Sequence, residues 1–184
     1  MNRWHISLLF LLLLLLPMCA LAEEDLSNQN LTSGFKGGTL KSGHYTMVED
    51  VTLTETWEIN AESDLNGKFT VINTIELDLN GYQLMVTGKA RILIDGGAMT
   101  ITDSTGGGRI IGEMQTDDSV GDHLFVISNA LDNSGKLLNA GVLNTQLVST
   151  NLVQSNLGLL YIDGDSEKYP GASLSGGRYV ADLS

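Results

Sequence analysis

The segment Ile75-Glu76-Leu77-Asp78-Leu79-Asn80-Gly81 decides the fold, because it places a short strand directly before a tight turn. Apolar side chains at every second position predict a β-strand with one buried face. The Asn80-Gly81 pair predicts a turn, since both residue types tolerate a positive φ. Similar short apolar bursts, separated by glycine-rich turns, fill most of the chain. The pattern therefore indicates an all-β protein.

Outward from this segment, the bursts are of two kinds. Val51 with Leu53, and Met99 with Ile101, alternate with polar residues and predict strands buried on one face. Residues 92–94, 124–127 and 159–162 are continuously apolar, which is typical of strands buried more completely. The best helical candidate, residues 132–138, is short and contains Gly135. We expect no helix of importance.

Two short motifs recur in the same order. Ile94-Asp95-Gly96 returns as Ile162-Asp163-Gly164 after 68 residues, and Gly107-Gly108-Arg109 returns as Gly176-Gly177-Arg178 after 69. A displacement of 68 divides into three turns of about 22 to 23 residues, within the range of periods typical of solenoids. The repeat predicts a coil of stacked turns.

Residues 75–84, 97–104 and 107–112 together resemble the secreted right-handed parallel β-helix modules of bacterial surface proteins, which belong to the pectate-lyase-like superfamily. Residues 173–179 are similar to a later turn of such modules, whereas residues 113–155 do not follow the pattern. The resemblance implies three short parallel strands per turn, with inward side chains stacked in ladders. We therefore expect a short right-handed single-stranded parallel β-helix. The alternative is an antiparallel β-sandwich, with hairpin turns at Asn66-Gly67 and Asn80-Gly81.

The chain divides into three parts. Residues 1–22 combine Arg3, a leucine-rich run, Pro17 and a small-residue cleavage site, which predicts a signal peptide and a secreted or cell-surface protein. Residues 23–38 are polar and predict a flexible leader or an N-terminal cap, with order beginning near Thr39. Residues 39–184 form the expected β-helix domain. It stops directly after a rung-like pattern, which is compatible with truncation at the C-terminus.

The charge balance limits the partners. Removing Arg3 with the signal leaves 9 basic and 22 acidic side chains, a formal charge of −13. Such a chain repels nucleic acid and anionic membranes, and we expect no membrane insertion after cleavage. Cys19 is the only cysteine and leaves with the signal, so the mature chain has no thiol chemistry.

Enzymes that act on polysaccharides are an alternative, because relatives of this fold include lyases and hydrolases. A lyase would draw on basic and acidic side chains that no spacing places on one strand face: Lys89, Arg91, Arg109, Asp95 and Asp103. A hydrolase would need two or three carboxylates across a cleft. The acidic candidates with a histidine, Asp117, Asp118, Asp122 and His123, are compressed into a few residues and are better explained as a polar loop.

Binding sites leave weaker traces. Asp163, Asp165 and Glu167 alternate as oxygen donors and could hold calcium incidentally, but Lys168 and Leu174 exclude an EF-hand. Glycan stacking needs an aromatic ring on an open face. The candidates are Trp57, Tyr82, Tyr161, Tyr169 and Tyr179, of which we favour Tyr82 and Tyr179; Tyr161 is expected in the core, and His44 with Tyr45 in an early strand or cap.

These observations predict a secreted, non-catalytic surface or extracellular module with a scaffold or adhesion role and glycan contact. We assign no catalytic, metal or cofactor residues, and the partner is an extracellular glycan or a surface protein. The alternatives are a polysaccharide-active lyase or glycosidase, or a truncated relative of one, and a β-sandwich glycan-binding module.

Overall fold

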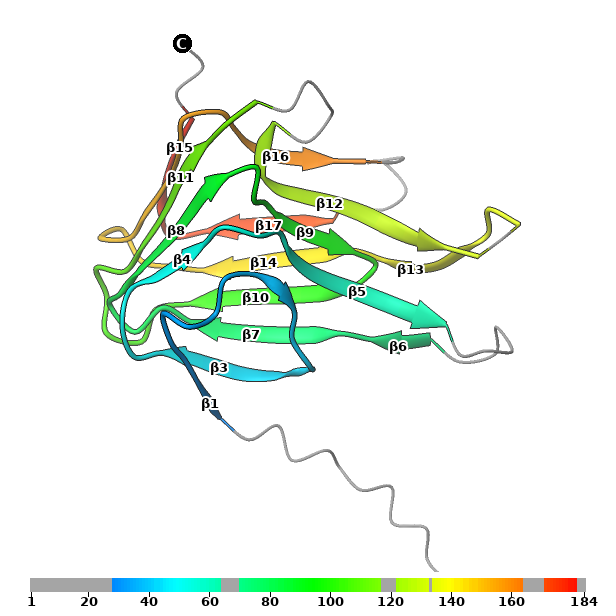
Figure 1. Cartoon of the computed structure of the whole chain (residues 1–184), viewed down its shortest axis with the longest axis horizontal. Coiled ribbons are helices and arrows are strands. Elements are labelled where there is room, and N and C mark those ends of the chain that lie inside the picture. The colour runs from blue at the N-terminus through cyan, green and yellow to red at the C-terminus, as the bar shows by residue number, and fades with distance from the viewer. Residues whose placement is uncertain (1–27, 64–69, 117–121, 133, 164–170, 182–184) are drawn as a thin grey trace, which may run out of the picture.

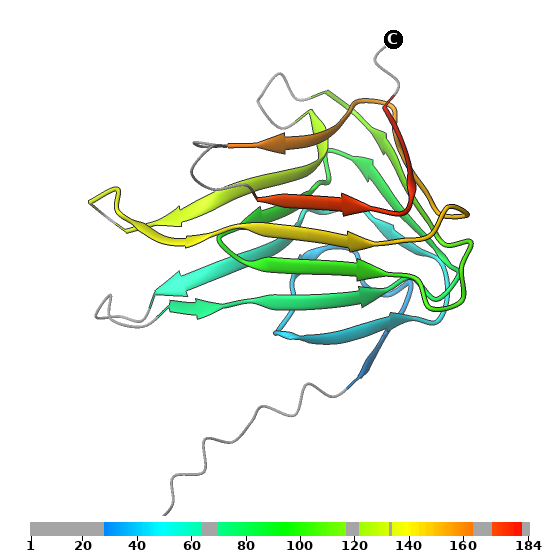
Figure 2. The same cartoon turned by 180° about the vertical axis from the view of Figure 1, so that it is seen from behind.

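A computed structural model describes residues 28–63, 70–116, 122–132, 134–163 and 171–181. The expected signal peptide and the Asn66-Gly67 turn lie outside these residues. Within them the chain is all-β, and it winds as a coil of stacked turns (Figures 1 and 2). No helix in the described part is long and apolar enough to cross a bilayer.

Three sheets run along the coil, and successive strands of one turn enter sheets A, C and B in that order. Sheet A contains β1 (Gln29–Leu31), β3 (Gly43–Met47), β7 (Thr74–Asp78), β10 (Ala98–Thr102), β14 (Val142–Gln146) and β17 (Ala172–Ser175). Sheet C contains β4 (Val51–Leu53), β8 (Gln83–Gly88), β11 (Arg109–Met114), β15 (Leu152–Ser155) and β18 (Arg178–Ala181). Sheet B contains β2 (Gly38–Thr39), β5 (Trp57–Ser63), β9 (Ile92–Asp95), β12 (His123–Leu131) and β13 (Leu137–Ala140), and β16 (Gly158–Ile162) also pairs with β12.

Pairing along all three sheets is parallel, as expected of a parallel β-helix. In the described residues, antiparallel strand pairing occurs in two hairpins, β5 with β6 (Thr70–Ile72) and β12 with β13. The antiparallel β-sandwich therefore does not describe this chain. The handedness of the coil stays a prediction.

Inward side chains stack in register between turns and form the core. In sheet A one such row runs Tyr45, Leu77, Ile101, Thr145, Leu174. In sheet B another runs Trp57, Ile92, Phe125, Leu160. Leu77, Ile101, Trp57 and Ile92 have no exposed surface. Burial of these ladders supplies the main favourable free energy of the fold.

The corner between sheets A and C depends on glycine and on polar side chains. At Asn80-Gly81 both φ angles are positive, 48° and 82°, and Tyr82 N donates to Leu79 O at 2.9 Å. Such a turn usually closes a hairpin, but here it leads β7 into β8 of another sheet. One turn further on, Asp103 accepts hydrogen bonds from Gly81 N and Gly108 N, both at 2.7 Å, and from Asn151. These side chains tie successive corners together.

The sequence repeat is real in three dimensions but spans two turns, not three. Ile94 pairs with Ile127, which pairs with Ile162, so the repeated motifs lie at equivalent positions two turns apart. Arg109 is related to Arg178 through Leu152 in the same way. Dividing 68 residues by three was wrong, because the turns containing hairpins are longer than a minimal turn.

Those hairpins project from the corner between sheets B and A, on one side of the molecule (Figures 1 and 2), and β6 contacts β13. Residues 132–138, the helical candidate, form the β12–β13 connection and the start of β13. Asp132 closes that connection by accepting hydrogen bonds from Ser134 N and Lys136 N, at 2.8 and 2.9 Å. Hydrogen bonds from Ser134 and then Lys136 lower the pKa of Asp132.

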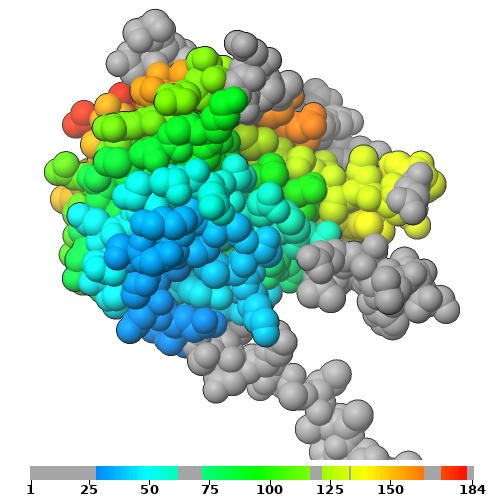
Figure 3. Space-filling model, viewed as in Figure 1, coloured from blue at the N-terminus to red at the C-terminus, as the bar shows by residue number. Residues whose placement is uncertain are grey.

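The two ends of the coil differ. Residues 28–38, where we expected a leader or a cap, include β1 and contribute the buried Leu31. Phe35 packs edge-on against Trp57, with ring centroids 5.1 Å apart. Figure 3 shows the N-terminal residues lying over the first full turn. At the other end, the inward-facing Leu174 is 40% exposed, so the described part leaves this end of the core partly open.

Candidate functional site

The outer face of sheet A carries two polar rows. One row runs His44, Glu76, Thr100, Asn144, Ser173 from turn to turn, and the other runs Thr46, Asp78, Thr102, Gln146. Because parallel strands lie about 4.8 Å apart, each row presents hydrogen-bonding groups at a regular spacing along the coil axis. Sheet A faces the viewer in Figure 2.

An open groove of about 270 Å³ lies at the N-terminal end of this face. Three successive strands, β3, β7 and β10, supply most of its lining, and one residue comes from just before β1. The lining residues are Asn28, His44, Tyr45, Thr46, Glu76, Asp78 and Thr102. Period-two alternation places Glu76 and Asp78 on the outside, because Ile75 and Leu77 on the same strand are buried.

Two printed contacts order the groove. His44 Nδ1 lies 2.7 Å from Glu76 Oε2, with the two side chains 41% and 51% exposed. Thr46 Oγ1 donates to Asn28 Oδ1 at 2.9 Å. An exposed ion pair contributes at most about 1 kcal/mol to stability. The main consequence of these contacts is therefore the orientation of the lining side chains.

Asp78 is held as a carboxylate. Burial raises its pKa, but hydrogen bonds from Ser104 and Asn80 outweigh burial and lower the pKa below its ordinary value. Asn80 N and Ser104 N both donate to Oδ1, at 2.8 and 2.9 Å, which leaves Oδ2 for a ligand. Beneath the groove, burial raises the pKa of Tyr45, opposed by a hydrogen bond with Gln29, and the Tyr45 hydroxyl donates to Lys41 O at 2.9 Å.

The lyase candidates are distributed over different surfaces. Asp95 lies on sheet B and accepts a hydrogen bond from Ser128 at 2.9 Å, Asp103 lies in the A–C corner, and Arg109 is exposed on sheet C. Lys89 is exposed in the connection between β8 and β9. The structure does not bring these five candidates into one groove.

Arg91 is a buried structural residue. Its side chain is about 5% exposed, and it donates to Ala90 O at 2.6 Å and to Gln115 O at 2.9 Å. It also lies 3.6 Å from the Asp122 carboxylate. These partners tie β9 to the end of β11 and to the approach to β12, so Arg91 stabilises the corner between sheets C and B.

Of the hydrolase candidates, Asp117 and Asp118 lie outside the described residues. Asp122 pairs with Arg91, whereas His123 packs against Tyr161 with ring centroids 5.5 Å apart. The buried His123 Nδ1 has no hydrogen-bond partner. Asp122 and His123 therefore belong to two different sets of contacts, and the described part shows no acid pair across a cleft.

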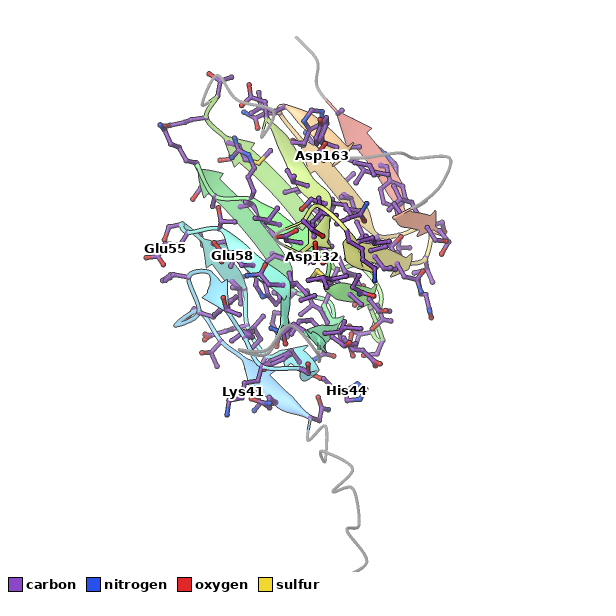
Figure 4. The ribbon with its side chains drawn as sticks, turned by 90° about the vertical axis from the view of Figure 1, so that its right-hand side faces the viewer. Lys41, His44, Glu55, Glu58, Asp132 and Asp163 are labelled. Atoms are coloured by element: carbon purple, nitrogen blue, oxygen red, sulfur yellow. The ribbon has the colours of Figure 1, made fainter. Side chains whose placement is uncertain are left out.

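The calcium candidate is only partly described. Asp163 is exposed after β16, while Asp165 and Glu167 lie outside the described residues. Among the residues that are described, no group of three or more His, Cys, Asp or Glu side chains could hold a metal ion. Figure 4 shows Asp163 far from His44, toward the opposite end of the coil.

The aromatic candidates separate clearly, except Tyr169, which lies outside the described residues. Trp57 is fully buried, and Tyr179 faces inward in register with Val153, its hydroxyl 2.5 Å from Thr145 Oγ1. Tyr161 was expected in the core, but it is half-buried on the outer face in register with Val126. Tyr82 is 36% exposed at the A–C corner and is the favoured platform that stays on the surface.

The groove residues were missed at the sequence level. His44 was noted only as part of an early strand or cap, and Glu76 and Asp78 only as the polar positions of a strand. The available signal was that outward positions of consecutive strands are polar. Aligning these positions required the length of each turn, which the hairpins obscured.

Comparison with protein-family models, with curated proteins and with solved structures finds no match to this chain.

Proposed function

We propose that this chain is a secreted, non-catalytic β-helix module that acts as an extracellular or cell-surface scaffold and contacts glycans through the groove on sheet A. Export would follow from the signal-like residues 1–22. The proposal includes the resemblance to the pectate-lyase-like modules of bacterial surface proteins. The observation that carries it is the groove itself, where three successive strands present polar side chains in register.

The rows suit a glycan for a physical reason. Sugar hydroxyls both donate and accept hydrogen bonds, and Thr46, Asp78 and Thr102 offer hydroxyl and carboxylate partners on a rigid sheet. Beyond the groove, Asn144 and Gln146 continue the two rows. An extended polysaccharide can therefore follow the coil axis and replace water at successive turns.

A polysaccharide-active enzyme remains the competing proposal. It would need acidic and basic side chains gathered around one glycosidic bond. The described candidates instead occupy sheet B, sheet C and two corners. That distribution favours binding without turnover.

The test is retention of the purified chain on immobilised glycans, with and without calcium, alongside assays for unsaturated products and new reducing ends. We expect retention of one glycan class, no cleavage, and no requirement for calcium. Thr46→Val should weaken retention, whereas Thr52→Val on the outer face of sheet C serves as the matched control. Cleavage, or equal effects of both variants, would refute the proposal.

A further inference from the structure

We infer that the groove on sheet A selects glycans that carry free amino groups. This inference rests on the proposed function and names the ligand class of the same site. Its starting point is the charge of the lining: the groove contains the carboxylates Glu76 and Asp78, and none of its lining residues is a lysine or arginine.

The two carboxylates suit an ammonium group. Glu76 and Asp78 are two positions apart on β7, so their side chains leave the same face roughly 7 Å apart. Hydrogen bonds from Asn80 N and Ser104 N hold the Asp78 carboxylate by Oδ1, and its pKa is lowered. His44 Nδ1 contacts Glu76 Oε2 and limits the rotation of that side chain. An ammonium between Glu76 and Asp78 would make charge-assisted hydrogen bonds to both.

The other lining groups suit the rest of a sugar. Thr46 and Thr102 carry hydroxyls, and Asn28 carries an amide, so neutral donors and acceptors surround the acidic pair. Lys41 also lies near the N-terminal end of the coil, but Figure 4 shows its side chain well apart from His44. The formal charge of −12 for the whole chain adds a longer-range attraction for cationic polymers and a repulsion for polyuronates.

The experiment compares three oligosaccharides of equal length: glucosamine oligomers with free amino groups, their fully N-acetylated counterparts, and oligogalacturonate. Binding is measured by calorimetry at low and at moderate salt. We expect the amino form to bind most tightly and to weaken as salt screens the contact. Glu76→Gln, which keeps the shape of the side chain, should lower the affinity for the amino form by about threefold to tenfold.

Glu113→Gln is the matched control, because Glu113 is exposed on the outer face of sheet C. It should leave the affinity unchanged. Equal losses in both variants would show attraction to overall charge and would overturn the inference. Equal binding of the N-acetylated form, or preference for oligogalacturonate, would overturn it while leaving glycan contact in place. Failure of every sugar to bind, here and on the immobilised glycans, would overturn the proposed function as well.

Discussion

Shortening one leucine in the middle of the sheet A core row should cost far more stability than shortening one at the open end. Leu77 and Leu174 belong to the same inward row, but Leu77 has no exposed surface and Leu174 is 40% exposed. Leu77→Ala removes the side chain between two neighbouring turns and leaves a cavity, which costs about 3 to 4 kcal/mol. Leu174→Ala loses only the buried part of its transfer free energy and leaves no closed cavity, so it should cost about 1.5 kcal/mol or less.

Urea unfolding followed by circular dichroism measures both variants. With a slope near 2 kcal/mol per molar, the midpoint should fall by about 2 M for Leu77→Ala and by less than 1 M for Leu174→Ala. Unchanged slopes would show that both variants unfold from the same compact state. A loss for Leu174→Ala equal to or larger than that for Leu77→Ala would refute the ladder packing.

Three further predictions concern single positions. Arg91→Met should cost about 3 kcal/mol, because it removes the buried partner of Asp122 and of two carbonyls, while Arg109→Met on the surface should change stability by under about 0.5 kcal/mol; denaturant unfolding distinguishes them. Asp78→Asn keeps Oδ1 as an acceptor but loses the charge; since the pKa of Asp78 is lowered, the carboxylate stabilises the fold above about pH 4 and this contribution is lost as pH falls further, so unfolding measured at several pH values should show the deficit of the variant shrinking in acid, and a deficit independent of pH would contradict this. Gly176→Ala should lower the melting temperature well beyond Gly107→Ala, because both have positive φ but only at Gly176 would the added Cβ collide with Leu147 O; equal shifts would count against this corner.

The strand pattern and the parallel coil could be predicted from the sequence for a physical reason. Ile75, Leu77 and Met99 face a shared core in short strands, so their spacing of two reports burial directly. Asn80-Gly81 needs positive φ in a corner as much as in a hairpin, and the sequence therefore marked the turn but not its connection.

The site and the length of each turn could not be predicted in the same way. The hairpins β5–β6 and β12–β13 lengthen individual turns, so a displacement of 68 residues covers two turns and misleads a fixed period. Glu76 and His44 are 32 residues apart and become neighbours only through the register of β3 with β7. Tyr161 was assigned to the core because its neighbours are apolar, but alternation along β16 turns its ring outward.

The most direct test of the central claim is a nuclear magnetic resonance titration of the isotope-labelled chain with the glycan that it retains most strongly. We predict amide shift changes at the outward residues His44, Thr46, Glu76, Asp78 and Thr102, with the glycan recovered intact. Shift changes confined to sheet B or sheet C, or recovery of a cleaved glycan, would contradict the assignment of sheet A as a non-catalytic contact surface.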